Sequence, residues 1–213
     1  MPFDLLFVTD CLAEALRRED QALRLEQAVY GLDSRDELEL HAILARHLAA
    51  HFEVAREVHY PSSAGARASH RQRCDLVLTP RGRPLQRDTA PPTLFDPADT
   101  TPPTEALWLE VKVACQFREG HVRHGGYGAQ WRSAIVADLK KMEADPLIRE
   151  AALVLIVFNE SESILLKDLD LFELVLVQKE VLAGFRQVRG IPIPDRIGHR
   201  LCTVALWPTV QRA

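Results

Sequence analysis

The spacing of apolar residues changes along the chain and predicts which segments form helices. Residues 3–30 and 35–50 repeat apolar positions every three or four residues, as the buried face of a helix does. Ser34 and Glu37 stand at the spacing of a capping box, so we expect the second helix to begin there and to end near Ala50. Its apolar stripe consists of Leu40, Ile43, Leu44 and Leu48.

Two further helices and five strands follow from the same criterion. Residues 129–145 and 167–185 have helical periodicity. Short alternating or continuously apolar runs predict strands at residues 52–60, 74–79, 106–114, 151–158 and 200–207. The run at 151–158 is apolar throughout, which is typical of a central strand covered on both faces. Residues 118–128 are expected to form a loop, and residues 191–199 a connector.

The order of these elements predicts an α/β fold with a central mixed sheet flanked by helices. Residues 80–105 hold seven of the 13 prolines and separate two predicted strands, so we expect a proline-rich insertion there. The 213 residues suit a single domain.

Composition narrows the class of protein. Hydrophobic residues make up 47% of the chain and charged residues 26%, as in ordinary soluble proteins. A net charge of -4 excludes a polycation but leaves room for a local basic face. The four cysteines form no C-x-x-C pair, which argues against a zinc ribbon and fits a reducing cytoplasm. No signal peptide and no membrane-spanning run are evident, so we expect a cytoplasmic protein without a membrane partner.

The predicted strand at 106–114 carries an unexpected charged pair. Side chains alternate along a strand, so Glu110 and Lys112 share a face while Leu109 and Val111 occupy the other. Asp75 begins the preceding strand, and it meets Glu110 if the two strands are neighbours. Two carboxylates, with the Val111 carbonyl as a further ligand, can hold Mg²⁺ or Mn²⁺. A lysine beside them can orient a water or neutralise a phosphate, which suits phosphodiester hydrolysis.

Each of these residues also has a simpler interpretation. Glu110 and Lys112 can form the solvated face of an edge strand, where charges oppose aggregation. Asp75 can be a strand-entry residue, and a capping box alone explains Glu37. His121 and His124 have metal-like spacing, but no two further ligands stand nearby in the sequence. The cysteines are expected to be small buried hydrophobes.

The segments "CDLVL" and "LWLEVKV", at residues 74–78 and 107–113, resemble the core signature of the PD-(D/E)XK phosphodiesterase superfamily. The resemblance implies a restriction-endonuclease-like core at residues 35–158, with a helical N-terminal extension at 1–33 and a C-terminal helix and strand at 159–213. It implies a Mg²⁺ or Mn²⁺ site formed by Asp75 and Glu110, with Lys112 as the catalytic lysine. The supporting residues that it implies are Glu37, or in second place Glu39, on the preceding helix, and Gln130 or Gln116 after the lysine strand. Cys74 stands where the family often has proline, and the gap from Asp75 to Glu110 is wide.

Basic residues near the predicted site suggest contacts to a nucleic acid. Arg71 and Arg73 lead into the Asp75 strand, and Arg118 and Arg123 lie in the loop after the lysine strand. Solubility alone also explains them. Tyr127 and Trp131 can stack on bases, although Trp131 falls on the apolar stripe of its helix.

The function expected from the sequence is a metal-dependent nuclease that acts on DNA, with RNA as the other substrate. The alternative is a non-catalytic subunit that keeps the nuclease fold as a scaffold for nucleic acid or protein. A homodimer or a larger protein complex is compatible with either. Hydrolysis of another phosphoester is a third interpretation. The family suggests, by analogy only, a role in bacterial genome defence or repair.

Overall fold

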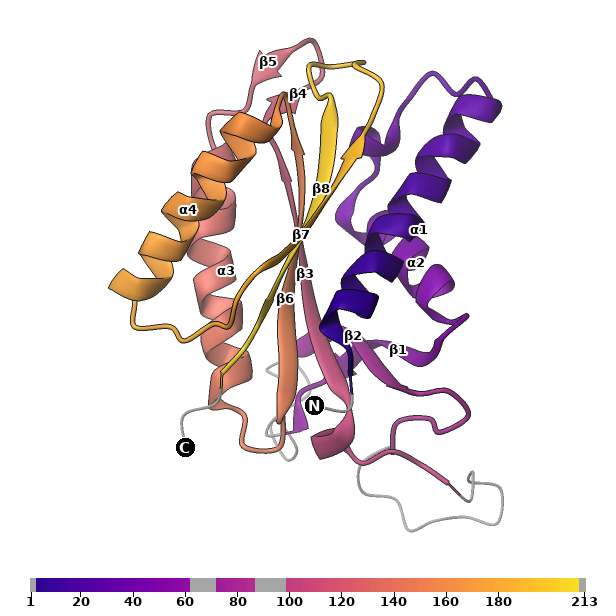
Figure 1. Cartoon of the computed structure of the whole chain (residues 1–213), viewed down its shortest axis with the longest axis vertical. Coiled ribbons are helices and arrows are strands. Elements are labelled where there is room, and N and C mark those ends of the chain that lie inside the picture. The colour runs from indigo at the N-terminus through magenta and orange to yellow at the C-terminus, as the bar shows by residue number, and fades with distance from the viewer. Residues whose placement is uncertain (1–2, 62–71, 87–98, 211–213) are drawn as a thin grey trace.

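A computed structural model describes residues 3–61, 72–86 and 99–210, except for the side chains of residues 130–134. The six strands of its main sheet lie in the order β1-β2-β3-β6-β8-β7, and helices flank both faces (Figure 1). The chain is therefore an α/β protein, as its pattern of elements predicts. All neighbouring strands are antiparallel except β3 and β6, so the sheet is mixed.

Each predicted strand is present. β1 spans Phe52–His59, β2 Arg73–Pro80, β3 Leu107–Cys115, β6 Glu150–Asn159 and β8 Leu201–Pro208. β6 is buried along its length apart from the half-buried Glu150, which confirms it as a central strand. β3 lies between β2 and β6, so the interpretation of Glu110 and Lys112 as an edge-strand face is wrong.

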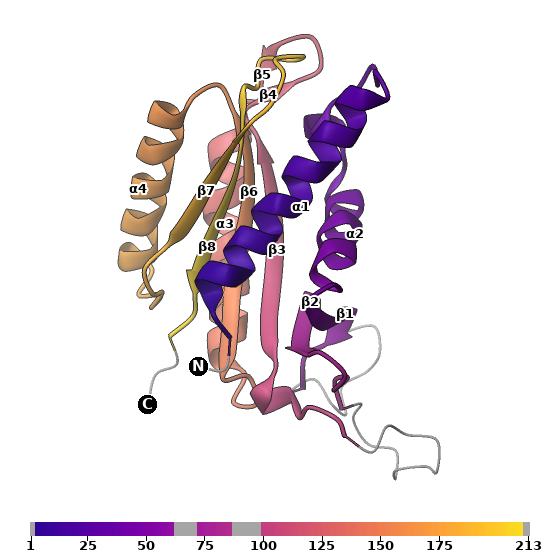
Figure 2. The same ribbon diagram turned by 45° about the vertical axis from the view of Figure 1, so that its right-hand side comes forward.

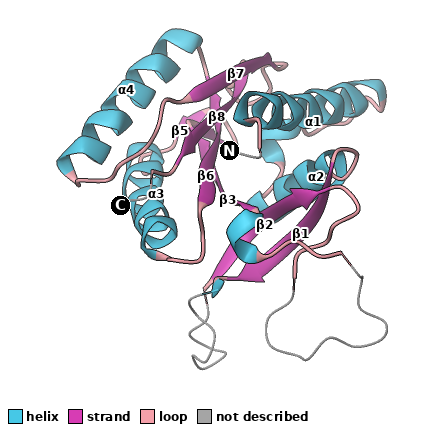
Figure 3. Cartoon of the chain, turned by 60° about the horizontal axis from the view of Figure 1, so that its bottom comes forward, coloured by secondary structure: helices cyan, strands magenta, loops and turns pink. Residues whose placement is uncertain are grey.

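Two helical layers enclose two hydrophobic cores. α1 (Leu5–Leu25) and α2 (Glu37–Leu48) cover one face of the sheet, and α3 (Tyr127–Ala144) and α4 (Glu162–Gln178) cover the other (Figure 2). α2 packs over β1, β2 and β3, while α1 lies over β7 and β8 (Figure 3). Leu109 and Val111 face the first layer and Trp108 faces the second, which confirms the predicted alternation along β3.

The start of α2 differs from the prediction. Asp36, not Ser34, is the N-cap, and its carboxylate accepts a hydrogen bond from the Glu39 N–H at 2.8 Å. Glu39 returns a bond to the Asp36 N–H and completes the capping box. The sequence contains the capping-box spacing twice, at Ser34–Glu37 and at Asp36–Glu39. Ser34 lies in a 3-10 turn, and its hydroxyl donates to the Gly31 carbonyl. The box therefore leaves the Glu37 carboxylate free for another role.

The C-terminal part contributes more strand than predicted. β7 (Gln187–Pro192) forms one edge of the sheet, although no strand was predicted there and its last two residues fall in the expected connector at 191–199. α4 begins five residues earlier than expected and ends before the predicted stop near Gly184. The predicted C-terminal helix and strand are thus a helix and two strands.

The two remaining connections also differ in detail. The predicted loop at residues 118–128 contains a small hairpin, formed by β4 (Phe117–Arg118) and β5 (Val122–Arg123). The proline-rich insertion is closed at its base by a bridge between Leu85 and Thr101. Residues 87–98 of that insertion lie outside the described part of the chain. Across the described residues, no helix is long and apolar enough to cross a membrane.

Candidate metal and phosphate site

The site lies where β2 and β3 separate. The two strands pair only from Leu78–Leu107 to Leu76–Leu109, although β2 continues beside β1 as far as Arg73. Asp75 is the first residue beyond the last pair. Its Oδ2 accepts a hydrogen bond from the Val111 N–H at 2.7 Å. The carboxylate therefore replaces a strand partner and is held at the opening between the strands.

Val111 directs its carbonyl toward the same opening. The N–H and C=O of one strand residue point to the same neighbouring strand, and here the N–H points to Asp75. The carbonyl also favours the protonated form of the nearby His41 ring. The predicted backbone ligand thus lies on the open side of β3.

Lys112 projects into the opening and is surrounded by carboxylates. Its Nζ lies 3.6 Å from Glu37 Oε1, 3.9 Å from Asp75 Oδ2 and 3.7 Å from Asp138 Oδ2. Burial acts to lower the pKa of Lys112, but the carboxylates outweigh it and the net pKa is raised. Lys112 is therefore a firmly charged cation.

Glu110 is the most deeply buried acid of the site, with 2% of its side chain exposed. Its Oε1 accepts hydrogen bonds from the Tyr60 hydroxyl and from Lys141 Nζ, the latter at 2.6 Å. Burial, and then the charge of Asp75, raise the pKa of Glu110 to about 7 in spite of these two donors. The Glu110 carboxyl therefore changes between its neutral and its charged form near neutral pH.

Asp75 and Glu110 influence each other's protonation. Burial raises the pKa of Asp75, and the Val111 N–H, Lys112 and a hydrogen bond with Glu110 only partly offset it. Two adjacent buried carboxyl groups resist carrying two negative charges unless a cation joins them. The pair thus has the electrostatic character of an acidic cation site.

A second lysine, Lys141 on α3, places a positive charge beside the Glu110 carboxyl. Lys141 Nζ contacts Asp138 at 3.1 Å in addition to Glu110, and it lies 4.7 Å from the centre of the Tyr60 ring. Asp138 in turn reaches Lys112. The sequence reasoning missed both α3 residues. Their signal was a charged pair three residues apart beside the apolar stripe of a helix.

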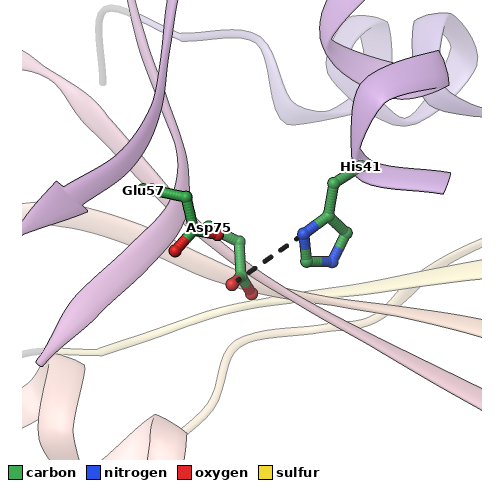
Figure 4. A group of neighbouring side chains, drawn as sticks. All are labelled: His41, Glu57 and Asp75. Atoms are coloured by element: carbon green, nitrogen blue, oxygen red, sulfur yellow. Dashed lines mark ion pairs between the residues drawn. The ribbon is translucent and has the colours of Figure 1, made fainter. Parts of the chain in front are cut away.

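A histidine on α2 faces Asp75 from the other layer. His41 follows Glu37 by one helical turn, and its Nδ1 lies 4.0 Å from Asp75 Oδ1 (Figure 4). The side chain is 2% exposed, and within the described residues neither ring nitrogen has a partner at hydrogen-bond geometry. Burial is the main cause that lowers the pKa of His41, so the ring is neutral and has a free lone pair.

Glu57 completes a group that can hold a metal ion. One ligand atom each from His41, Glu57 and Asp75 lies within 4.8 Å of the others (Figure 4). Glu57 has a φ of 52°, which is rare for a residue other than glycine. That strained residue lies in β1 opposite Asp75, where the regular pairing of β1 and β2 skips one position.

This donor set fits a divalent cation. Carboxylates and a backbone carbonyl are ligands for Mg²⁺ or Mn²⁺, and a neutral imidazole is a ligand for Mn²⁺ and other transition metals. The observation that favours a metal over a purely structural cluster is His41, since buried polar atoms normally have partners. Among the residues that the structure describes, its ring nitrogens meet the Val111 carbonyl and the Asp75 carboxylate without forming a well-shaped hydrogen bond. Comparison of the chain with protein-family models, with curated proteins and with solved structures found no match.

The other predicted residues lie at varying distances from this site. Gln116 is buried and its side-chain oxygen accepts from the Glu160 N–H, and the Glu39 carboxylate belongs to the α2 cap. Arg73 is exposed two residues before Asp75. Arg118 and Arg123 lie on the β4–β5 hairpin, where Arg118 contacts His124. Arg71 and the side chains of Gln130 and Trp131 lie outside the described part of the molecule.

Two further expectations concern individual side chains. The Tyr127 hydroxyl donates to Asp168 at 2.9 Å, which ties this ring to α4. Cys11, Cys74 and Cys202 are buried and Cys115 is half-buried, and all four are free thiols, as expected for small hydrophobes.

Proposed function

We propose that the chain is a metal-dependent nuclease that hydrolyses phosphodiester bonds in DNA, on a core of the restriction-endonuclease-like kind. The observation that carries the proposal is the convergence of Asp75, Glu110 and Lys112 at the opening between β2 and β3. A buried acid pair with a charged lysine beside it suits a phosphodiester better than an uncharged substrate.

The cation would be held by His41, Glu57 and Asp75, whose ligand atoms lie together, and Glu110 and the Val111 carbonyl would be the further ligands expected from the resemblance. Mg²⁺ or Mn²⁺ bound there would polarise the phosphoryl oxygen and lower the pKa of a bound water. An imidazole ligand favours Mn²⁺ over Mg²⁺ in this set.

Lys112 acts in this proposal as a fixed positive charge. Its raised pKa means that it donates hydrogen bonds and does not accept a proton from water. It would orient the attacking water and neutralise the charge that develops on the phosphate. Glu37 and Asp138 position its ammonium group from opposite helical layers.

The scaffold alternative also has an observation in its favour. Glu110 Oε1 is already engaged by Lys141 and Tyr60, an arrangement that stabilises the buried acid without a metal. A protein that uses the acid pair only to hold α3 against β3 would bind nucleic acid or protein without cleaving it.

The deciding experiment is cleavage of single-stranded DNA, double-stranded DNA and RNA by the purified chain with Mg²⁺ or Mn²⁺. We expect metal-dependent cleavage that falls at least about 100-fold in Lys112→Ala and in Asp75→Asn. Lys179→Ala, at the exposed C-terminal end of α4, is the matched control and should cleave like the wild type. Absence of cleavage on all three substrates, with metal binding intact, would favour the scaffold.

A further inference from the structure

Lys141 of α3 holds its positive charge between two carboxylates of the candidate site. Its Nζ lies 2.6 Å from Glu110 Oε1 and 3.1 Å from Asp138 Oδ1. The Lys141 side chain is only 19% exposed, so the contact with the buried Glu110 is largely withdrawn from water. A buried ammonium group is costly unless acids lie against it, and these two carboxylates meet that requirement.

The Glu110 carboxyl lies between Lys141 and the residues proposed to hold a cation. Its Oε1 contacts Lys141, and a hydrogen bond joins the same carboxyl to Asp75. Asp75 belongs to the group with His41 and Glu57 whose ligand atoms lie within 4.8 Å of one another. Glu110 therefore stands between two positions for positive charge, one at that group and one at Lys141 Nζ.

The position of Lys141 Nζ would suit a second metal ion. In two-metal sites the ions lie about 3.5–4 Å apart. Mg²⁺ or Mn²⁺ needs only one or two carboxylates from the protein, since waters complete its shell. Glu110 and Asp138 supply such a pair, and an oxygen of each lies within 3.1 Å of Lys141 Nζ. An ammonium group at that point excludes a metal ion, because like charges repel and the two cannot share the space.

The balance of charge agrees with a single divalent cation. Among the described residues, the site joins two ammonium groups, those of Lys112 and Lys141, to five carboxyl groups, those of Glu37, Glu57, Asp75, Glu110 and Asp138. Five acids against two lysines leave three negative charges, which one divalent cation largely neutralises. Without Lys141 the excess is four, which two divalent cations would balance.

We propose that the Lys141 ammonium group takes the place of a second divalent cation, so that the candidate site binds one ion and the loss of this charge lets it bind two. The inference rests on the proposed function, because the first cation is the one proposed at His41, Glu57 and Asp75. Lys141 is a positioning residue in this role, since it acts on the site through Glu110 and Asp138.

The number of Mn²⁺ ions bound at saturation tests this inference without nucleic acid and without cleavage. Equilibrium dialysis should give one ion per chain for the wild type and two for Lys141→Met. Electron paramagnetic resonance should show an isolated ion in the wild type and a magnetically coupled pair in Lys141→Met, because the two ions would lie only about 3.5–4 Å apart. A lysine with a purely structural role would change the stability of the fold and not the number of ions.

Further variants make the test specific. Lys141→Gln keeps a hydrogen-bond donor for Glu110 without the charge and should also bind two ions, whereas Lys141→Arg keeps the charge and should bind one. Asp138→Asn combined with Lys141→Met should return the number to one, because it removes half of the carboxylate pair. Lys140→Met is the matched control: it removes the same charge from an exposed neighbour on α3 and should bind one ion. Thermal unfolding of every variant verifies that the fold is retained.

The outcomes separate this inference from the proposed nuclease. Equal numbers of ions in the wild type, Lys141→Met and Lys141→Gln would overturn the inference, and cleavage by the wild type would then leave the nuclease standing. Two ions in the wild type, or a second ion that persists in the Asp138→Asn double variant, would also overturn it. No ion in the wild type and one in Lys141→Met would support Lys141 as the substitute for a cation and remove the metal from the proposed nuclease.

Discussion

The buried carboxyl of Glu110 should make the stability of the fold fall as the pH rises through neutrality. Burial raises its pKa from an ordinary value of 4.5 to about 7. An acid of this kind stabilises the folded chain fully at pH values below 4.5, where it is protonated in both states. That stabilisation is lost as the pH rises through about 7, because the folded chain must then hold a buried charge.

The size of the effect follows from the two pKa values. In the unfolded chain Glu110 has already lost most of its proton at about pH 5, whereas in the folded chain it loses the proton only between about pH 5 and pH 8. Each unit by which the two pKa values differ corresponds to roughly 1.4 kcal/mol of unfolding free energy. Wild-type protein should lose about 2.5 kcal/mol of unfolding free energy from this group over that interval. Such a loss is a sizeable part of the roughly 5–15 kcal/mol that stabilises a typical domain.

Urea unfolding in EDTA, followed by the fluorescence of the buried Trp108 and Trp207, measures the effect. Glu110→Gln cannot ionise, so its stability relative to the wild type should improve by about 2.5 kcal/mol between about pH 5 and pH 8. The constant cost of the amide cancels in this comparison. Glu105→Gln, which changes an exposed acid before β3, should shift in parallel with the wild type at every pH.

A flat difference between wild type and Glu110→Gln across this pH range would refute the reasoning. It would mean that Lys141 and Tyr60 hold the carboxylate ionised in the fold, so that their donation outweighs burial. The same result would weaken the case for a cation site, since an acid already neutralised by Lys141 has less need of a metal.

Three further predictions concern the neighbours of the site. Asp36→Ala should destabilise the chain by about 1 kcal/mol through loss of the α2 cap, and urea unfolding should show a smaller change for Ser34→Ala if Asp36 is the true cap. Mn²⁺ at about 100 times its dissociation constant should stabilise the wild type by roughly 2.7 kcal/mol, and calorimetry should detect little of this in His41→Leu but all of it in His51→Leu. Tyr60→Phe removes a hydrogen bond to the buried Glu110 and should cost about 1–3 kcal/mol in the same urea assay, whereas no loss would show that the hydroxyl is dispensable.

Short-range periodicity predicts the part of the site that lies on one strand. The alternation of side chains places Glu110 and Lys112 on one face, and the adjacency of two strands brings Asp75 to them. His41 was predictable in principle, because it stands four residues after Glu37 on the same helix face. Its value as a ligand depends on the lack of a hydrogen-bond partner among the described residues, which only three-dimensional packing reveals.

Contributions from distant elements were not predictable from local pattern. Glu57 reaches the site only because the pairing of β1 with β2 skips a position and the residue adopts a positive φ. Lys141 contacts Glu110 because α3 packs against β3, and this packing depends on tertiary structure and not on local sequence. The capping-box prediction was wrong for a different reason: Ser34 and Asp36 both satisfy its spacing, but Ser34 lies in a 3-10 turn and its hydroxyl donates to Gly31 instead.

The opening between β2 and β3 explains how both helical layers serve one site. A continuous sheet separates the helices on its two faces by a layer of backbone, and each helix packs about 10 Å from that layer. Where β2 leaves β3, Glu37 of α2 and Asp138 of α3 approach the same Lys112 ammonium from opposite sides. Removal of the Asp75–Val111 bond should therefore affect more than one ligand, because that bond joins β2 to β3 beyond their last paired residues. Asp75→Asn retains an acceptor for the Val111 N–H, whereas Asp75→Ala does not. Both variants lose the negative charge, so the difference between their unfolding free energies measures the contribution of this hydrogen bond.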